Sequence, residues 1–150
     1  MKILIIPVLI FMSFTLYAKK PLGSKGVISV IEAVKLLDAN DKEWSKKVKG
    51  VFELTVNGTG KDGGWYYLNS NKNYRIKNNL TISFSKHIYK RLSKKYGKDP
   101  LEFLIGKKIH VKGEAKKVKI HKIENGKVTN LVYFQSHVIL DAIKNIEIVD

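Results

Sequence analysis

Apolar positions change their spacing along the chain, and each change predicts a different element. Ser29 stands three residues before Glu32, the spacing of a helix capping box, and the apolar residues that follow recur every three or four positions. This pattern predicts a short amphipathic helix over 29–39. From Lys47 the apolar period becomes two, which is the spacing of a half-buried strand.

Further strands are expected where this alternation returns. The glycine-rich segment 57–64 predicts a hairpin loop, because glycine and asparagine accept positive φ. Lys116 and Lys117 interrupt the alternation of a later strand and predict a bulge or bend, and the pair at 125–126 (Asn-Gly) predicts a tight hairpin turn. The expected later elements are strands at 65–70, 79–85, 107–120, about 128–140 and 145–149, and a helix over 86–96 that stops at Gly97.

The first eighteen residues have the pattern of a secretory signal peptide. Lys2 precedes an apolar run that ends at Tyr17, and Ala18 follows as a small boundary residue. The run is shorter than the ~20 apolar residues that cross a bilayer comfortably, and a retained anchor is the alternative. We therefore expect a periplasmic or secreted protein with a cleaved signal peptide at 1–18, a flexible leader at 19–27 and one domain at 28–150.

Charge and composition narrow the range of partners. The chain has 28 Lys and Arg residues against 13 Asp and Glu residues, a formal net charge of +15. Such a charge attracts polyanions, although lysine-rich composition without a specific partner is the alternative. The chain has no cysteine, which excludes disulfides, a lipidated cysteine anchor and thiolate metal sites.

The order of elements is that of an OB-fold, a small Greek-key barrel, with another small α+β barrel or an open sheet as the alternative. Three segments also resemble a family of small OB-fold domains in exported bacterial proteins: 67–75 (YLNSNKNYR), 79–82 (NLTI) and 106–113 (GKKIHVKG). The resemblance covers roughly 28–149, with a departure at Asp141, which alanine follows where the family has proline. It implies a fold and, by analogy only, a binding role. We expect a mainly β protein, a five-stranded OB-fold barrel with an N-terminal helix and a helix between strands three and four.

An OB-fold binds ligands along its second and third strands, between two flanking loops that would be 57–64 and 121–127 here. Strand alternation directs Trp65, Tyr67 and Asn69 outward if their neighbours point inward. Aromatic rings beside cations suit single-stranded nucleic acid, because bases stack on the rings and cations contact phosphate. Burial of Trp65 beneath the first helix is the alternative. The candidate binding residues are Trp65, Tyr67, Asn69, Lys47, Lys49, Lys61, Arg75 and Lys77.

Catalysis, cofactors and metals are not expected. The acidic residues are scattered singly, and the histidines lack the spacing of ligands on one helix. His110 and His137 could meet across neighbouring strands, but the sequence offers no third ligand. We therefore expect a monomeric binding module for a polyanion, with nucleic acid as the first candidate. The alternative is a cell-envelope interaction domain that binds anionic lipid, cell-wall polymer or a protein through the same surface.

Overall fold

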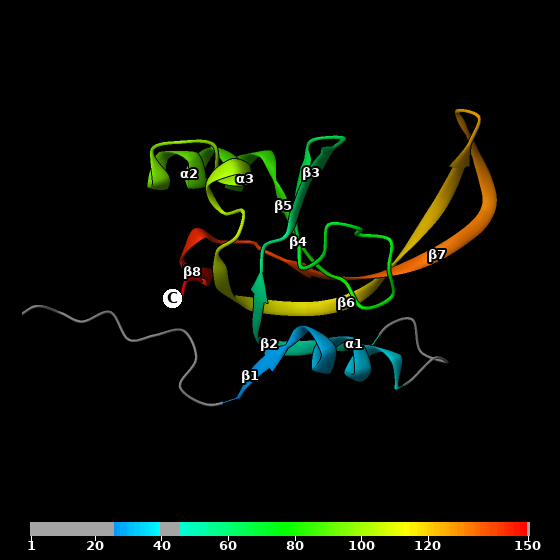
Figure 1. Cartoon of the computed structure of the whole chain (residues 1–150), viewed down its shortest axis with the longest axis horizontal. Helices are drawn as coiled ribbons and strands as arrows, with labels where there is room; N and C mark the ends of the chain where they lie inside the picture. Colours follow the sequence, from blue (N-terminus) through cyan, green and yellow to red (C-terminus); the bar gives the residue numbers. More distant parts are fainter. Residues whose placement is uncertain (1–25, 40–45, 150) are drawn as a thin grey trace, which may run out of the picture.

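The computed structural model describes residues 26–39 and 46–149. The predicted signal peptide, most of the predicted leader and Trp44 lie outside these ranges. The described chain is mainly β, as expected, and its strands form one curved sheet (Figure 1). In chain order the elements are β1 (Val27–Ser29), α1 (Val30–Asp38), β2 (Lys47–Thr55), β3 (Gly58–Asp62), β4 (Trp65–Asn69), β5 (Leu80–Ser85), α2 (Lys86–Tyr96), α3 (Pro100–Phe103), β6 (Lys108–Glu124), β7 (Lys127–Ile139), the 3-10 helix η1 (Ile143–Asn145) and β8 (Ile146–Ile148).

Local sequence sets the ends of the two longer helices, and both predicted helices are confirmed. Ser29 Oγ accepts a hydrogen bond from the backbone N–H of Glu32 (3.3 Å), which caps α1. Ser85 Oγ accepts one from the backbone N–H of Ile88 (3.5 Å), which caps α2. Gly97 ends α2 in the left-handed conformation, with φ 70°.

All eight described strands belong to one mixed sheet. Its order is β1-β2-β6-β7-β5-β4-β3, and β8 pairs with β6. The β1–β2 and β5–β7 pairs are parallel, and the other pairs are antiparallel. Val27, which we expected in the flexible leader, is the first residue of β1 and pairs with Val51.

The chain bends between β2 and β3, which Val56 and Asn57 separate. Val56 N donates to Lys107 O (3.0 Å), next to the start of β6. Asn57 N donates to Asn69 O (2.9 Å), at the end of β4. One stretch of chain therefore pairs with β6 before the bend and with β4 after it, and this division contributes to the larger number of strands than the five expected.

The predicted hairpin loop over 57–64 is wrong. Residues Gly58–Asp62 form β3, which pairs with β4, and the turn consists of Gly63 (φ 53°) and Gly64 (φ 83°). An edge strand can form through backbone hydrogen bonds alone, so its side chains need not show apolar alternation. Composition therefore indicated a loop where the backbone is paired.

The bulge predicted at Lys116 and Lys117 is also wrong, because the β6–β7 register is continuous there and shifts between His121 and Ile123. Ala115 is the last fully buried residue of β6. Beyond it the strand leaves the core and pairs with β7, so alternation of apolar residues is no longer required. The paired ends of β6 and β7 project as a two-stranded arm (Figure 1), which closes at the predicted Asn-Gly turn.

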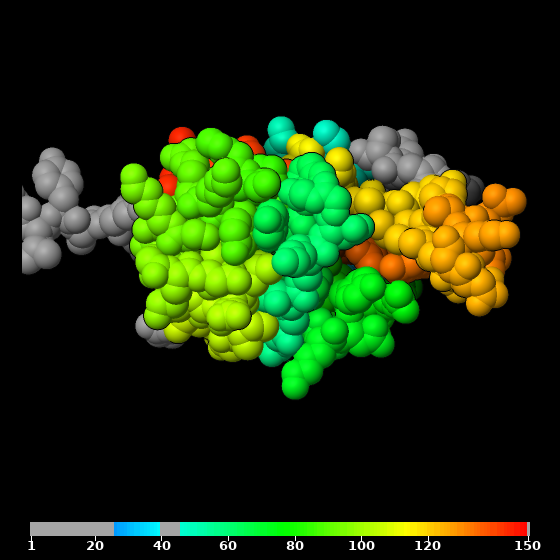
Figure 2. All heavy atoms as spheres, turned by 90° about the horizontal axis from the view of Figure 1, so that it is seen from above, coloured from blue at the N-terminus to red at the C-terminus, as the bar shows by residue number. Residues whose placement is uncertain are grey.

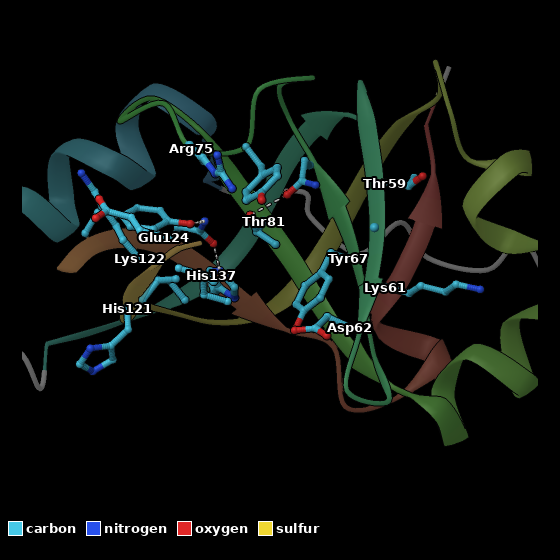
Figure 3. A pocket seen from close by; sticks show the side chains of 17 residues that line it. Thr59, Lys61, Asp62, Tyr67, Arg75, Thr81, His121, Lys122, Glu124 and His137 are labelled. Atoms are coloured by element: carbon cyan, nitrogen blue, oxygen red, sulfur yellow. Dashed lines mark hydrogen bonds between the residues drawn. The ribbon is translucent and has the colours of Figure 1, made fainter. Parts of the chain in front are cut away.

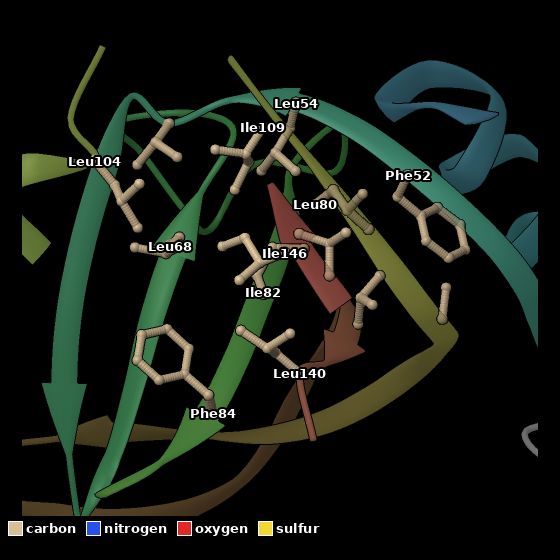
Figure 4. Packing of buried hydrophobic residues seen from close by; sticks show 14 of the residues in the cluster. Phe52, Leu54, Leu68, Leu80, Ile82, Phe84, Leu104, Ile109, Leu140 and Ile146 are labelled. Carbon is tan, nitrogen blue, oxygen red and sulfur yellow. The ribbon is translucent and has the colours of Figure 1, made fainter. Parts of the chain in front are cut away.

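Buried apolar side chains fill the space enclosed by the sheet (Figure 4). Phe52, Leu68 and Phe84 are fully buried on three different strands. The core cluster extends from Ala33 to Ile146. The protein without the predicted signal peptide, residues 19–150, therefore contains the whole cluster. Within the described ranges, every helix is too short or too polar to span a bilayer.

Candidate functional site

A groove of about 730 Å³ lies between the β3–β4 hairpin and the β6–β7 arm, with the 70–79 loop beside it. Figure 2 shows this region from above, with the 70–79 loop in green and the tip of the arm in orange. Its floor and walls therefore come from segments far apart in the sequence. The lining residues are Thr59, Gly60, Lys61, Asp62, Tyr67, Asn69, Tyr74, Arg75, Thr81, Ile120, His121, Lys122, Ile123, Glu124, Tyr133, Gln135 and His137.

Tyr67 of β4 forms the wall on the hairpin side. Its ring meets the ring of His137 edge-on, with centroids 6.2 Å apart. Figure 3 shows the Tyr67 hydroxyl directed toward Asp62 at the end of β3. Burial, and then the negative charge of Asp62, raise the pKa of Tyr67, so the phenol stays protonated and can donate a hydrogen bond to a ligand.

A row of polar side chains on β7 forms the opposite wall. Tyr133, Gln135 and His137 are two residues apart, so they share one face of the strand. Gln135 Nε2 donates to the Tyr133 hydroxyl (3.1 Å), which leaves Gln135 Oε1 to accept from His137 Nε2 (2.8 Å). This pattern requires the proton of a neutral His137 to sit on Nε2. The row is thus held in place before any ligand binds.

His137 is a neutral group at the floor of the groove. Only 6% of its surface is exposed. Burial, and then the positive charge of Lys116, lower the pKa of His137 to about 4. At neutral pH the ring therefore offers hydrogen bonding without charge.

Asn79 attaches the 70–79 loop to the sheet. Its Oδ1 accepts from Ser70 Oγ (3.2 Å) and from the backbone N–H of Asn71 (3.0 Å). Its Nδ2 donates to Thr81 Oγ1 (2.9 Å), and that hydroxyl donates to Asn69 Oδ1 (2.8 Å). These residues lie in the segments 67–75 and 79–82. Here they build a buried network that holds the loop.

Arg75 stands at the rim of the groove on this loop. Its guanidinium carbon lies 5.4 Å from the centre of the Tyr74 ring. Interaction with the hydroxyl of Tyr74, and then with that of Tyr133, favours the charged form of Arg75 and raises its pKa. Arg75 therefore links the loop to β7 as a permanent cation. The described carboxylates form no salt bridge with it.

Replacing Asn79 with alanine should destabilise the protein by about 2 kcal/mol, because buried partners lose their hydrogen bonds. The freed loop should also lower ligand affinity, since Tyr74 and Arg75 lose their fixed positions. Urea unfolding followed by circular dichroism measures the first effect. The matched control is Asn78→Ala, which changes an exposed neighbouring asparagine. Equal stability of the two variants would contradict this role for Asn79.

The structure brings together some of the predicted site residues and separates others. Tyr67, Asn69 and Arg75 line the groove. Asn69 is 5% exposed and lies at the floor, where its Oδ1 is bound by Thr81. Lys61 contributes to the lining, but Figure 3 shows its side chain directed away from the other lining groups.

Three predicted phosphate-binding lysines lie outside the groove lining, in ion pairs. Lys47 Nζ is 2.8 Å and Lys49 Nζ is 3.9 Å from the carboxylate of Glu114, on the β2–β6 part of the sheet. Lys77 Nζ is 3.1 Å from Asp38 Oδ2 on α1. Net charge could not reveal these pairs, because they depend on which strands and loops become neighbours.

Trp65 is 43% exposed, so its burial beneath the first helix is ruled out. The helix α1 packs mainly against β2, while Trp65 pairs with Ser85 and Asp62 at the other end of the sheet path. Trp65 is not among the residues that line the groove. Among the described residues, the cation–ring contacts involve Tyr74, Tyr96 and Phe103 instead.

Tyr133 of β7 lines the groove but is absent from the binding residues predicted from the sequence. Tyr133, Gln135 and His137 alternate with period two, and that signal was available. Pairing of His137 with His110 is wrong, because His137 stands opposite Lys116 while His110 stands opposite Glu53. His110 Nε2 is 2.9 Å from Glu53 Oε2. Within the described ranges, no three His, Cys, Asp or Glu residues are grouped so as to hold a metal ion.

Comparison with known proteins leaves the chain without an assigned family. No family model matches it, and no curated protein matches it. It is similar to the crystal structure of a protein from Leishmania major Friedlin that was assigned as an aspartyl-tRNA synthetase, at a TM-score of 0.40 and 13% identity. The match covers 88% of this chain and 22% of the other chain, so this chain spans about a fifth of its length. A similarity at this level carries no argument about function.

Proposed function

We propose that the strands form an OB-type barrel. In this interpretation β2 and β3 together are its first strand, and β4, β5, β6 and β7 are the second to fifth strands. The bend at Val56 and Asn57 supports this, because it lets the first strand pair with both β6 and β4. The helix α2 lies between the third and fourth strands, and the groove lies beside the second. β1 and β8 are short additions at the edges.

We propose that the groove binds single-stranded nucleic acid. The observation that carries this proposal is the meeting of three tyrosines, Tyr67, Tyr74 and Tyr133, with Arg75 in one open groove. Tyrosine rings can stack on bases, and a fixed guanidinium can bind phosphate in a bidentate manner. No chemical step is required of the protein, so it acts as a binding module.

The distribution of charge orients the ligand. Arg75 is the cationic side chain on the loop side and Lys122 the one on the arm side, where Glu124 lies beside it, while Asp62 lies at the end of β3 (Figure 3). We expect phosphates to follow the cations and bases to enter between the rings. Gln135 and the neutral ring of His137 could then contact base edges at the floor. The protein would do this outside the cytoplasm, as a monomer, if residues 1–18 direct its export.

Salt dependence tests the contact with phosphate. For single strands, each neutralised phosphate contributes about −0.7 to the slope of log affinity against log salt concentration. Arg75→Gln should therefore make this slope shallower by about 0.7 and should weaken binding at low salt. The measurement is fluorescence anisotropy of a labelled oligothymidylate, titrated with the chain of residues 19–150 at several salt concentrations.

The matched control is Arg91→Gln, because Arg91 is the other arginine of the chain and lies exposed on α2. It should leave the slope unchanged. Equal slopes for Arg75→Gln and the unaltered chain would remove Arg75 from the proposed site. Preference for heparin or neutral oligosaccharide over the oligonucleotide would replace nucleic acid with polysaccharide as the ligand.

A further inference from the structure

We propose that the outward face of α2 binds the surface of an anionic lipid bilayer. This site is separate from the groove and goes beyond the function proposed above. The helix lies at the end of the molecule opposite the β6–β7 arm (Figures 1 and 2). None of its residues lines either of the two described cavities.

The cations of α2 form two rows along one face. Residues four apart on a helix lie one above the other, so the first row is Lys86, Lys90 and Lys94. Arg91 continues a second row that begins at His87, and Lys95 at the end of this row donates a hydrogen bond to Ile146 O (3.5 Å). All six of these side chains are exposed.

Packing of the inner face fixes the direction of these rows. Ile88 is 3% exposed and Leu92 is fully buried in the core. Tyr89 stacks on Tyr66, with ring centroids 4.1 Å apart, and Tyr96 packs against Phe103 at 4.8 Å. Both tyrosines of the helix are therefore engaged inward. The outward face is left with cations and without rings on which bases could stack.

The cations of α2 lower the stability of the protein when no partner is bound. Like charges four residues apart on a helix destabilise it, and Lys86 also stands at the helix N-terminus, where the helix dipole disfavours a cation. Residues 63–98 contain nine Lys and Arg residues and no Asp or Glu, so the segment provides no compensating acid of its own. An unfavourable local pattern of this kind indicates a functional surface, which an external anion would stabilise.

The cationic surface continues past the end of the helix. Lys98 and Lys107 place their Nζ atoms 4.9 Å and 4.8 Å from the centre of the Phe103 ring. Ile105, in the connection that follows α3, is 47% exposed. A cluster of four to eight cations on an amphipathic helix is typical of binding to anionic lipid, and a nearby apolar side chain can enter the interface.

A bilayer fits this face better than nucleic acid does. No α2 residue lines either described cavity, and a planar sheet of headgroups can meet both rows at once. The rings of Tyr89 and Tyr96 pack inward, so α2 offers no aromatic surface on which the bases of a single strand could stack. The proposed occupant is therefore a membrane that contains anionic phospholipid.

The test compares co-sedimentation of residues 19–150 with vesicles of phosphatidylglycerol and phosphatidylcholine and with vesicles of phosphatidylcholine alone. The chain should bind the anionic vesicles selectively. The variant Lys90→Gln with Lys94→Gln should bind them about 30-fold more weakly, because each lysine near such a surface contributes roughly fivefold. Thermal unfolding should show that this variant remains folded, because the loss of like-charge repulsion offsets the loss of Lys94 from the last turn, where the helix dipole favours a cation.

The matched control is Lys112→Gln with Lys119→Gln, which removes two exposed lysines from β6. It should change vesicle affinity less than about threefold. Equal losses in the two double variants, or equal binding to both kinds of vesicle, would overturn the proposal. Loss of oligonucleotide binding by the α2 variant without loss of vesicle binding would also overturn it, and would assign the helix to nucleic acid. The α2 variant should keep its oligonucleotide affinity. That result would show that the groove is intact and that the loss of vesicle binding comes from α2.

Discussion

Replacing both Tyr67 and Tyr133 with alanine should weaken binding of oligothymidylate about 100-fold. The two rings stand on β4 and β7, on opposite sides of the groove, so they can stack on different bases. Stacking of a base on an aromatic side chain contributes about 1–3 kcal/mol, and ~1.4 kcal/mol for each ring gives this factor. Fluorescence anisotropy with the labelled oligonucleotide measures the change.

The control for this pair is Tyr67→Phe with Tyr133→Phe, which keeps both rings and removes their hydroxyls. It should retain most of the affinity if stacking is the main contribution. Circular dichroism should show that both variants remain folded. Affinity within twofold of the unaltered chain for the alanine pair would eliminate the groove as a stacking site.

Acidification from about pH 7 to about pH 5 should lower the free energy of unfolding by about 2 kcal/mol through His137 alone. The ordinary pKa of histidine is 6.5, and burial lowers that of His137 to about 4 in the folded protein. Above pH 7 both states are neutral and pH has no effect through this residue. Between the two pKa values the unfolded chain binds a proton that the folded chain excludes, so stability falls by about 1.4 kcal/mol per pH unit.

Urea unfolding at the two pH values, with His137→Gln as the comparison, measures this contribution. The variant lacks the titrating ring, so its stability should fall by about 2 kcal/mol less over the same range. The pKa values of Asp38, Glu53 and Glu114 are also lowered in the folded protein. Their carboxylates lose stabilising contacts mainly below about pH 4.5, outside this window. The same pH dependence in both chains would mean that His137 is not held neutral by burial.

The sequence predicts the helices well because their signals are local. Ser85 and Gly97 mark the two ends of α2, and the spacing of Ile88 and Leu92 marks its buried side. Each of these effects acts over one or two turns of helix, so a single sequence contains it. The Asn-Gly turn of the β6–β7 arm is predictable for the same reason.

The groove is less predictable because it depends on strand pairing over long distances. Tyr67 meets His137 only because β4 and β7 both pair with β5. The registers of these two pairs depend on other residues along the three strands. The ion pairs of Lys47 and Lys77 have the same origin, since Glu114 and Asp38 lie on other elements. Alternation in β4 predicts that Tyr67 faces outward, but it does not predict which residues stand opposite.

Amide chemical shifts test the central claim, that the groove binds single-stranded nucleic acid, most directly. Two-dimensional ¹H–¹⁵N spectra of residues 19–150 would be recorded while unlabelled oligothymidylate is added. We expect the largest shifts in β3, β4, the 70–79 loop and the β6–β7 arm, with α2 almost unchanged. Shifts confined to α2, or none at all, would contradict it.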